Sequence, residues 1–214
     1  MIPLLHDFEG ETVLVFGGGS VGARKARHFA REAAVIVVSP SFSAADFGGA
    51  ELIRADPDAD AVAAWVARTD PALVVAATDD ETVNDAVETA ASDQNILCNR
   101  ADQSGPRDPG SVVVPATVRD GPVVVSVATG GRSPALSRAL RERIEPLVEN
   151  AGAMADLTAD LRSDLKERLP AGERRAVLRE VVRDDAVWKG LDSGSSNIDQ
   201  RVTDVISDVT GDCP

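Results

Sequence analysis

Short apolar runs alternate with amphipathic stretches over the first hundred residues. The apolar runs, at residues 12–16, 35–38, 52–53, 73–77 and 96–99, are rich in Val, Ile, Leu and Ala. The stretches between most of them place apolar side chains at helical spacing. Strands of nearly continuous apolar content that alternate with helices are typical of a parallel sheet covered on both faces. The pattern therefore predicts an α/β fold with a Rossmann-like domain over residues 1–110.

The pattern changes after that domain. Valine-rich segments at residues 112–114 and 123–127 flank Asp120-Gly121, a dipeptide typical of a tight hairpin, and Ser133-Pro134 has the residue types that begin a helix. A hairpin and one helix are too small to bury themselves well. Residues 111–150 are therefore predicted to be a small α+β dimerisation region that packs on a second copy of the chain.

The last third of the chain is predicted to be a helical C-terminal domain, residues 151–214. Apolar side chains recur every three or four residues in three stretches, at 154–169, 177–182 and 202–209. Residues 189–197 are rich in Gly and Ser and are predicted to form a loop.

A glycine-rich turn carries the first chemical signal. Residues 17–22 match the pattern GxGxxG, directly after a predicted strand and at the start of a predicted helix. In that context Gly17 allows the tight turn, Gly19 lets the backbone approach a pyrophosphate, and Gly22 permits close packing of helix on strand. The helix N-terminus adds free N–H groups and a partial positive charge. The predicted cofactor-binding residues are Gly17, Gly19, Ser20, Val21, Gly22, Ser41, Phe42, Thr78 and Asp79.

The end of the second strand bears on which dinucleotide would bind. Units that bind NAD usually place Asp or Glu there, but this chain has Ser39 followed by Pro40, Ser41 and Phe42. No arginine follows closely enough to hold a 2′-phosphate. NAD is therefore favoured over NADP, with Ser41 and backbone amides as the ribose contacts.

Charge and composition exclude several classes of protein. The chain has 35 acidic and 22 basic residues, a formal net charge of −13, only three lysines and no tyrosine. This charge disfavours a general nucleic-acid binder, and an acidic, lysine-poor composition is typical of proteins that work in concentrated salt. No apolar stretch reaches the ~20 residues that a membrane span needs, and no secretory signal is visible, so a cytoplasmic protein is expected. Two cysteines and two histidines, without ligand spacing, predict no metal site.

Four motifs follow one another along the chain: 17–25 (GGGSVGARK), 76–80 (AATDD), 99–102 (NRAD) and 129–134 (TGGRSP). With them, residues 2–145 resemble the precorrin-2 dehydrogenase and sirohydrochlorin ferrochelatase family, the N-terminal module of siroheme synthase. The resemblance implies oxidation of precorrin-2 to sirohydrochlorin with NAD⁺, a homodimer and, as in some members, insertion of Fe²⁺ as a second substrate.

The resemblance also implies a catalytic residue. The family's catalytic aspartate closes an N-x-x-D motif, which here makes Asp102 the catalytic residue and general base. The family usually has two apolar residues inside this motif, and Arg100 departs from that pattern. A carboxylate is a weak base in water, so we expect partial burial to raise the pKa of Asp102.

The implied substrate is a tetrapyrrole with eight carboxylates, which requires a positive zone on an acidic protein. Residues 100–145 hold seven arginines against five acidic residues, and guanidinium groups bind carboxylates at two points. Salt bridges on a helix surface are the simpler explanation for Arg141 and Arg143. The predicted substrate-binding residues are Asn99, Arg107, Thr129, Gly130, Gly131, Arg132 and Ser133.

Two other functions remain open from the sequence. One is a tetrapyrrole chelatase or carrier in which NAD binding is vestigial. The other is an NAD-sensing regulatory module, which predicts an acidic residue at the end of the second strand, where Ser39 stands. The fold by itself does not separate these functions.

Overall fold

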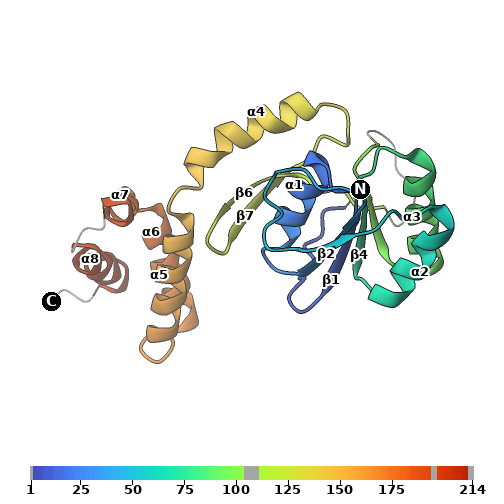
Figure 1. The fold of residues 1–214 in the computed structure, drawn as a ribbon. Helices are drawn as coiled ribbons and strands as arrows, with labels where there is room; N and C mark the ends of the chain where they lie inside the picture. Colours follow the sequence, from blue (N-terminus) through green and yellow to red (C-terminus); the bar gives the residue numbers. More distant parts are fainter. Residues whose placement is uncertain (1, 104–110, 194–196, 212–214) are drawn as a thin grey trace. The chain divides into compact units, whose positions relative to one another are not determined.

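A computed structural model describes residues 2–103, 111–193 and 197–211 (Figure 1). The chain forms two compact units. The first contains the residues up to Val114 together with Gly130–Arg132, and the second contains Pro115–Thr129 and the residues from Ser133 onward. The predicted three-part division, with boundaries after residues 110 and 150, stays a prediction.

The first unit is built on a parallel sheet of five strands in the order β3-β2-β1-β4-β5. These strands are β1 (Thr12–Phe16), β2 (Ala34–Ser39), β3 (Glu51–Arg54), β4 (Leu73–Ala76) and β5 (Leu97–Arg100). The chain leaves β1 toward β2 on one side and later returns to β4 on the other side. In such a sheet, ligands bind outside the carboxyl ends of the strands at this switch point. The predicted Rossmann-like sheet is confirmed.

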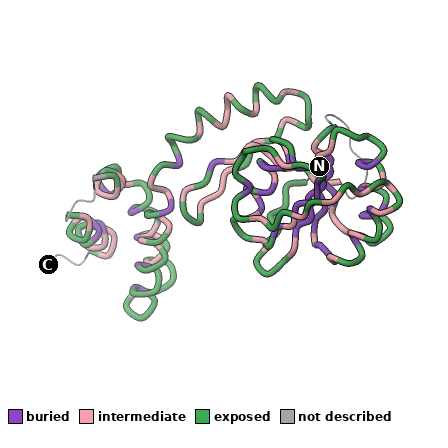
Figure 2. Tube along the Cα trace, viewed as in Figure 1, coloured by how far each residue is buried: buried purple, intermediate pink, exposed green. Residues whose placement is uncertain are grey.

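Three helices cover the two faces of this sheet: α1 (Ser20–Phe29), α2 (Ala59–Thr69) and α3 (Glu81–Asp93). Successive side chains of a strand point to opposite faces, so Leu14 and Phe16 pack with α2 and α3 while Val13 and Val15 pack with α1. All four side chains are fully buried, and Figure 2 shows the buried strands at the centre of this unit. The two-sided core fixes the carboxyl edge on which the site is built.

The segment after β5 differs from the prediction. Residues 112–114 were expected to form the first strand of the hairpin, but Ser111 pairs with Cys98, and the Val112 N–H donates to the Cys98 carbonyl at 2.8 Å. The segment therefore runs along the edge of β5. The hairpin itself is present, with β6 (Ala116–Asp120) and β7 (Val123–Val127) as its strands.

The second unit contains this hairpin and all the remaining helices, which are α4 (Pro134–Ile144), a 3₁₀ turn η1 (Glu145–Leu147), α5 (Ala151–Asp164), α6 (Ala171–Arg183), α7 (Asp185–Ser193) and α8 (Ile198–Thr210). Ser133 caps α4, since its hydroxyl accepts a hydrogen bond from the Leu136 N–H at 3.2 Å. The helix ends at Ile144, two residues before Pro146, because proline cannot continue the backbone hydrogen bonding.

The four C-terminal helices share an apolar core, as predicted from the apolar side chains that recur every three or four residues. Its buried members are Met154, Leu161, Leu165, Val177, Val181, Val187, Val202 and Val205. The predicted loop over 189–197 is wrong in its first part, because α7 extends to Ser193 and buries Val187 against its neighbours. The helical pattern there was hidden by Gly190 and Ser193, which are weak helix formers. None of the helices in the described parts of the chain combines the length and apolar content that crossing a membrane requires.

Candidate cofactor and catalytic site

The turn between β1 and α1 requires glycine at positions 17, 18 and 22, and a Cβ on Gly18 would lie 2.1 Å from the Ser41 carbonyl oxygen. Gly17 has a φ of 118°, and a Cβ on it would lie 2.3 Å from the Ala77 carbonyl oxygen of the neighbouring strand end. A Cβ on Gly22 would lie 1.9 Å from the carbonyl oxygen of Gly17. The backbone therefore turns and packs as the sequence predicts at Gly17 and Gly22, since only glycine fits these positions.

Gly19 differs from these three glycines. It precedes α1 with an ordinary φ of −75°, and a Cβ on it would meet nothing within 4 Å. The space beside Gly19 is therefore open without being required by the fold. The first N–H groups of α1 have no partners within the helix and face this end, which suits an anion.

One cavity of about 820 Å³ opens at the carboxyl ends of β1, β2 and β4. Eight of the nine predicted cofactor-binding residues line it, and the ninth, Gly22, packs behind it against Gly17. The structure thus brings together residues from three separate turns of the chain. The lining residues are Phe16, Gly17, Gly18, Gly19, Ser20, Val21, Val38, Ser39, Pro40, Ser41, Phe42, Ser43, Asp56, Pro57, Asp58, Ala77, Thr78, Asp79, Asp80 and Val83.

A fourth wall of this cavity was not predicted from the sequence. Asp56 and Asp58 follow β3, which pairs in parallel with β2 so that the two strands end side by side. Asp58 caps α2 by accepting from the Ala61 N–H at 2.9 Å. The alternation of strands and helices could have indicated this wall, because the carboxyl ends of adjacent parallel strands meet at one edge. Four aspartates and no Lys, Arg or His are among the lining residues.

The turn after β4 is fixed by a buried side chain of α3. The Asn84 amide accepts hydrogen bonds from the Thr78 N–H at 3.2 Å and from its hydroxyl at 2.8 Å, and it donates to the Thr78 carbonyl at 3.0 Å. Asn84 is 1% exposed. Asp80 then caps α3 by accepting from the Thr82 N–H at 2.8 Å. The cavity wall at Thr78 is therefore held in one conformation.

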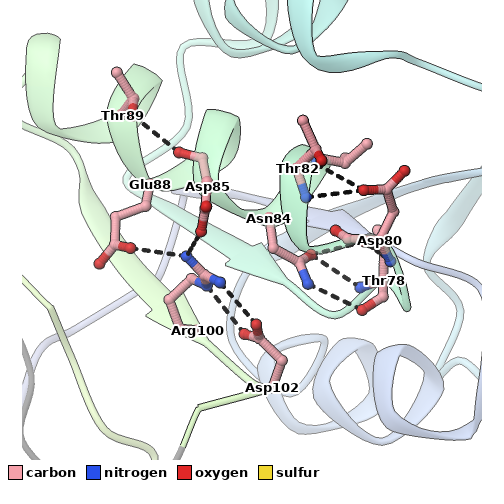
Figure 3. A network of polar contacts seen from close by, with 10 residues as sticks. Thr78, Asp80, Thr82, Asn84, Asp85, Glu88, Thr89, Arg100 and Asp102 are labelled. Atoms are coloured by element: carbon pink, nitrogen blue, oxygen red, sulfur yellow. Dashed lines mark hydrogen bonds and ion pairs between the residues drawn. The ribbon is translucent and has the colours of Figure 1, made fainter.

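Asp102 lies just past β5, as predicted, and is bound by Arg100 (Figure 3). The Arg100 Nε donates to Asp102 Oδ1 at 3.0 Å, and Nη2 donates to Oδ2 at 2.7 Å. This two-point contact, more than any other interaction, holds the pKa of Asp102 below its ordinary value, while burial pulls the pKa upward more weakly. The expected net rise of this pKa is therefore wrong, because the effect of the adjacent cation outweighs that of burial.

The predicted substrate-binding residues fall into several settings. Asn99 is 2% exposed, and its amide donates to the Val112 carbonyl at 2.7 Å, so it ties β5 to the following segment. The Thr129 hydroxyl donates to the Ser133 carbonyl at 3.1 Å. Gly130 and Gly131 both have positive φ, and Arg132 is exposed. Arg107 lies outside the described residues. The roles of all these residues in binding stay predictions.

The expected positive zone is partly neutralised. Arg100 is buried against carboxylates, Arg138 pairs with Glu142 at 2.9 Å, and Arg141 pairs with Glu145 at 3.0 Å. The interpretation of Arg141 as a salt-bridged surface residue is confirmed.

The sheet order, the glycine turn and the cavity at the switch point define a dinucleotide-binding protein of the Rossmann type. In agreement, residues 4–116 match a protein-family model described as "Putative NAD(P)-binding". The chain is also 33% identical to the precorrin-2 dehydrogenase of Methanosarcina barkeri, over 96% of this chain and 93% of that protein. It belongs to the precorrin-2 dehydrogenase family.

Two further relatives extend the comparison. The siroheme synthase of Pseudomonas paraeruginosa is 36% identical over 84% of this chain, which matches 38% of that longer protein. The solved structure of SirC, a precorrin-2 dehydrogenase, aligns with a TM-score of 0.69 at 24% identity, over 97% of this chain and all of the other. At that identity the structural likeness supports the fold.

Proposed function

We propose that this protein oxidises precorrin-2 to sirohydrochlorin with NAD⁺ as the hydride acceptor. The cavity beside Gly19, in a chain that belongs to this family, is the observation that carries the proposal. The open side of Gly19 and the N-terminus of α1 suit a diphosphate, and the 820 Å³ of the cavity is of the size that cofactor sites have. When bound there, NAD⁺ supplies the hydride-accepting ring.

The charge of the cavity supports NAD over NADP. Asp56, Asp58, Asp79 and Asp80 contribute only negative charge to its wall, which would repel a 2′-phosphate dianion. Arg54 lies near the same wall, but its guanidinium donates to the Pro40 carbonyl at 3.0 Å. We therefore expect tighter binding of NAD⁺ than of NADP⁺ in a direct titration. Equal affinities would remove this argument.

Asp102 is the proposed acceptor of the proton that the macrocycle loses. Loss of a hydride leaves the macrocycle positively charged, so the proton lost next is far more acidic than in the starting tetrapyrrole. A carboxylate of low pKa is therefore a sufficient base, provided that it is ionised and close to the C–H bond. Arg100 keeps it ionised.

We also propose a homodimer formed through the hairpin and α4. No residue of α4 is buried within the chain, and Leu136 is 49% exposed on it. Burial of such a helix in a symmetric contact would complete its packing. Light scattering is expected to give twice the mass of the chain, and a monomer at micromolar concentration would contradict this part of the proposal.

The test of the main proposal is direct. Purified protein is mixed with precorrin-2 and NAD⁺, and NADH formation is followed by absorbance; Fe²⁺ or Co²⁺ is added afterwards to test metal insertion. We expect NADH in proportion to precorrin-2 consumed. NAD⁺ binding without turnover would instead favour the carrier or sensor function, and no NAD⁺ binding would overturn the cofactor site.

A further inference from the structure

We infer that Arg100 is a positioning residue, whose guanidinium, held from behind by Asp85 and Glu88 of α3, fixes the direction of the Asp102 carboxylate at the edge of the sheet. The contact geometry belongs to the chain itself. The importance of Asp102 for turnover rests on the proposed function.

The contact between Arg100 and Asp102 is bidentate. Two different nitrogens of the guanidinium bind two different oxygens of the carboxylate, at 3.0 and 2.7 Å. A single hydrogen bond allows a carboxylate to swing about it, whereas two parallel bonds fix its plane. Arg100 also lies at the end of β5, so its own backbone is fixed by pairing with β4.

The opposite side of the guanidinium is held as firmly. The third nitrogen, Nη1, donates to Asp85 Oδ1 at 2.7 Å and to Glu88 Oε2 at 2.8 Å. Asp85 and Glu88 are three residues apart on α3 and so lie on the same side of that helix. Figure 3 shows the guanidinium between this pair and Asp102.

Burial keeps the Arg100 guanidinium with its carboxylate partners. Arg100 is 1% exposed, the largest side chain among those that are fully buried in the described parts of the chain. A buried guanidinium that lost its carboxylates would be left unsatisfied at a high cost in free energy. Arg100 therefore does not turn outward to bind a substrate carboxylate, and its effect on a substrate passes through Asp102.

The same helix also sets the cavity wall. Asn84, next to Asp85 in α3, makes the hydrogen bonds that fix Thr78, and Thr78 lines the cofactor cavity. One turn of α3 thus holds both the turn that lines the cavity and, through Arg100, the predicted proton acceptor. A displacement of this turn would move both groups.

The charges around Asp102 have a consequence for its protonation. The groups that face it are Arg100 from β5 and the Asn84 amide of α3, with Asp85 and Glu88 of α3 beyond the guanidinium. The two-point contact favours the ionised form of Asp102, and the two carboxylates of α3 offset part of the positive charge of Arg100. Asp102 accordingly stays available as a proton acceptor below the pH at which an ordinary aspartate becomes protonated.

Two substitutions separate charge from geometry. Arg100→Lys keeps a positive charge but cannot bind both oxygens of Asp102 in one plane, while Arg100→Met removes the charge as well. For each variant and the wild type we would measure thermal unfolding, NAD⁺ affinity, and kcat against pH with precorrin-2. The titration of the Asp102 carboxyl would be followed by ¹³C NMR, with its signal assigned by its loss in Asp102→Asn.

We expect Arg100→Lys to fold, to bind NAD⁺ normally and to lower kcat ~10- to 100-fold, because small displacements of a catalytic group have effects of that size. We expect Arg100→Met to lower kcat at least as much. It should also raise the pKa of Asp102 and move the acid limb of the kcat profile to higher pH.

Several outcomes would overturn the inference. A folded Arg100→Lys with the kcat of the wild type would show that the bidentate contact with Asp102 is not needed for turnover. This variant tests the inference even if Arg100→Met fails to fold. An unchanged Asp102 titration in a folded Arg100→Met would show that Arg100 does not control its charge. If the wild type has no turnover, the proposed function fails, and the NMR titration still decides whether Arg100 governs Asp102.

Discussion

The carboxyl edge of the sheet carries two sites built in opposite ways. Around Gly19 the edge is open, and it is shaped by backbone, with a cavity whose walls are turns and helix ends. At the end of β5 the edge is closed, and it is shaped by charged side chains that bind one another. The open end, around Gly19, leaves room for a ligand. The closed end, at the C-terminus of β5, holds the Asp102 side chain in a fixed direction.

The two ends can therefore supply different parts of the chemistry. Backbone N–H groups at a helix start bind an anion whose position is set by the fold, so the cavity suits a cofactor used unchanged in many proteins. A proton acceptor needs a defined direction and charge, which Asp102 receives from Arg100 and α3. Substitutions can therefore test the two ends separately.

The largest effect is expected from Gly19→Asp, which fills the open space of the cavity with bulk and negative charge. The fold should be kept, because a Cβ at this position meets nothing within 4 Å and φ is ordinary. NAD⁺ binding should become undetectable by calorimetry, since the diphosphate would be repelled.

A matched control is Gly172→Asp, the same replacement in the second unit, where a Cβ also meets nothing within 4 Å. Gly172 is exposed at the start of α6, and the variant should bind NAD⁺ as the wild type does. Undiminished affinity in Gly19→Asp would show that the cofactor binds elsewhere.

The next effect is expected from Asp102→Ala at the closed end. Turnover of precorrin-2 should fall at least ~100-fold, the usual size for a lost general base. NAD⁺ affinity should be nearly unchanged, because Asp102 is not among the residues that line the cavity. Steady-state kinetics and calorimetry on one preparation measure both. Turnover close to that of the wild type would exclude Asp102 as the base.

Much of the open end could be predicted from the sequence because part of its geometry is local. Gly22 is required by a contact with Gly17 in the same turn, and Gly17 by its own positive φ, so a short motif contains this information. The close approach of Gly17 to Ala77 depends in addition on the pairing of β1 with β4. The wall at Asp56 was missed because it depends on how β3 pairs with β2. The position of Asp102 followed from the family motif, whereas its environment did not.

The environment of Asp102 could not be predicted because it joins distant segments. Arg100 meets Asp85 and Glu88, which are fifteen and twelve residues away and on a different element. The residues next to an arginine in the sequence do not show whether its side chain is exposed or buried, so the sequence predicts Arg100 only as one of seven arginines in a positive zone. Likewise, α4 is amphipathic in sequence, yet no residue of it is buried within the chain.

A smaller effect is expected from Asn84→Ala, which acts on the link between the two ends. It removes the hydrogen bonds that fix Thr78 and the hydrogen bond between Asn84 and Asp102, and it keeps the ion pairs of Arg100 with its three carboxylates. We expect NAD⁺ to bind roughly tenfold more weakly, because the loss of buried hydrogen bonds costs about 1–2 kcal/mol. Asn84→Asp keeps the acceptor oxygen and should weaken binding less. Equal affinities of wild type and Asn84→Ala would show that the Thr78 turn does not contribute to the cofactor site.

The smallest effect concerns stability at the closed end and depends on pH. Because the pKa of Asp102 is lowered in the folded protein, its pairing contributes stability that is fully present above the ordinary aspartate pKa of about 3.9 and is lost as pH falls through the lowered value. Asp102→Asn should therefore unfold at lower urea concentration than the wild type at pH 7, by on the order of 1 kcal/mol. The difference should stay constant down to about pH 4 and shrink below it. In an Arg100→Met background the same substitution should have a smaller effect, because the main partner is gone and the hydrogen bond with Asn84 remains. An undiminished difference in that background would mean that Arg100 is not the main group that stabilises Asp102, and the closed end would then not be the ion-paired unit that distinguishes it from the open one.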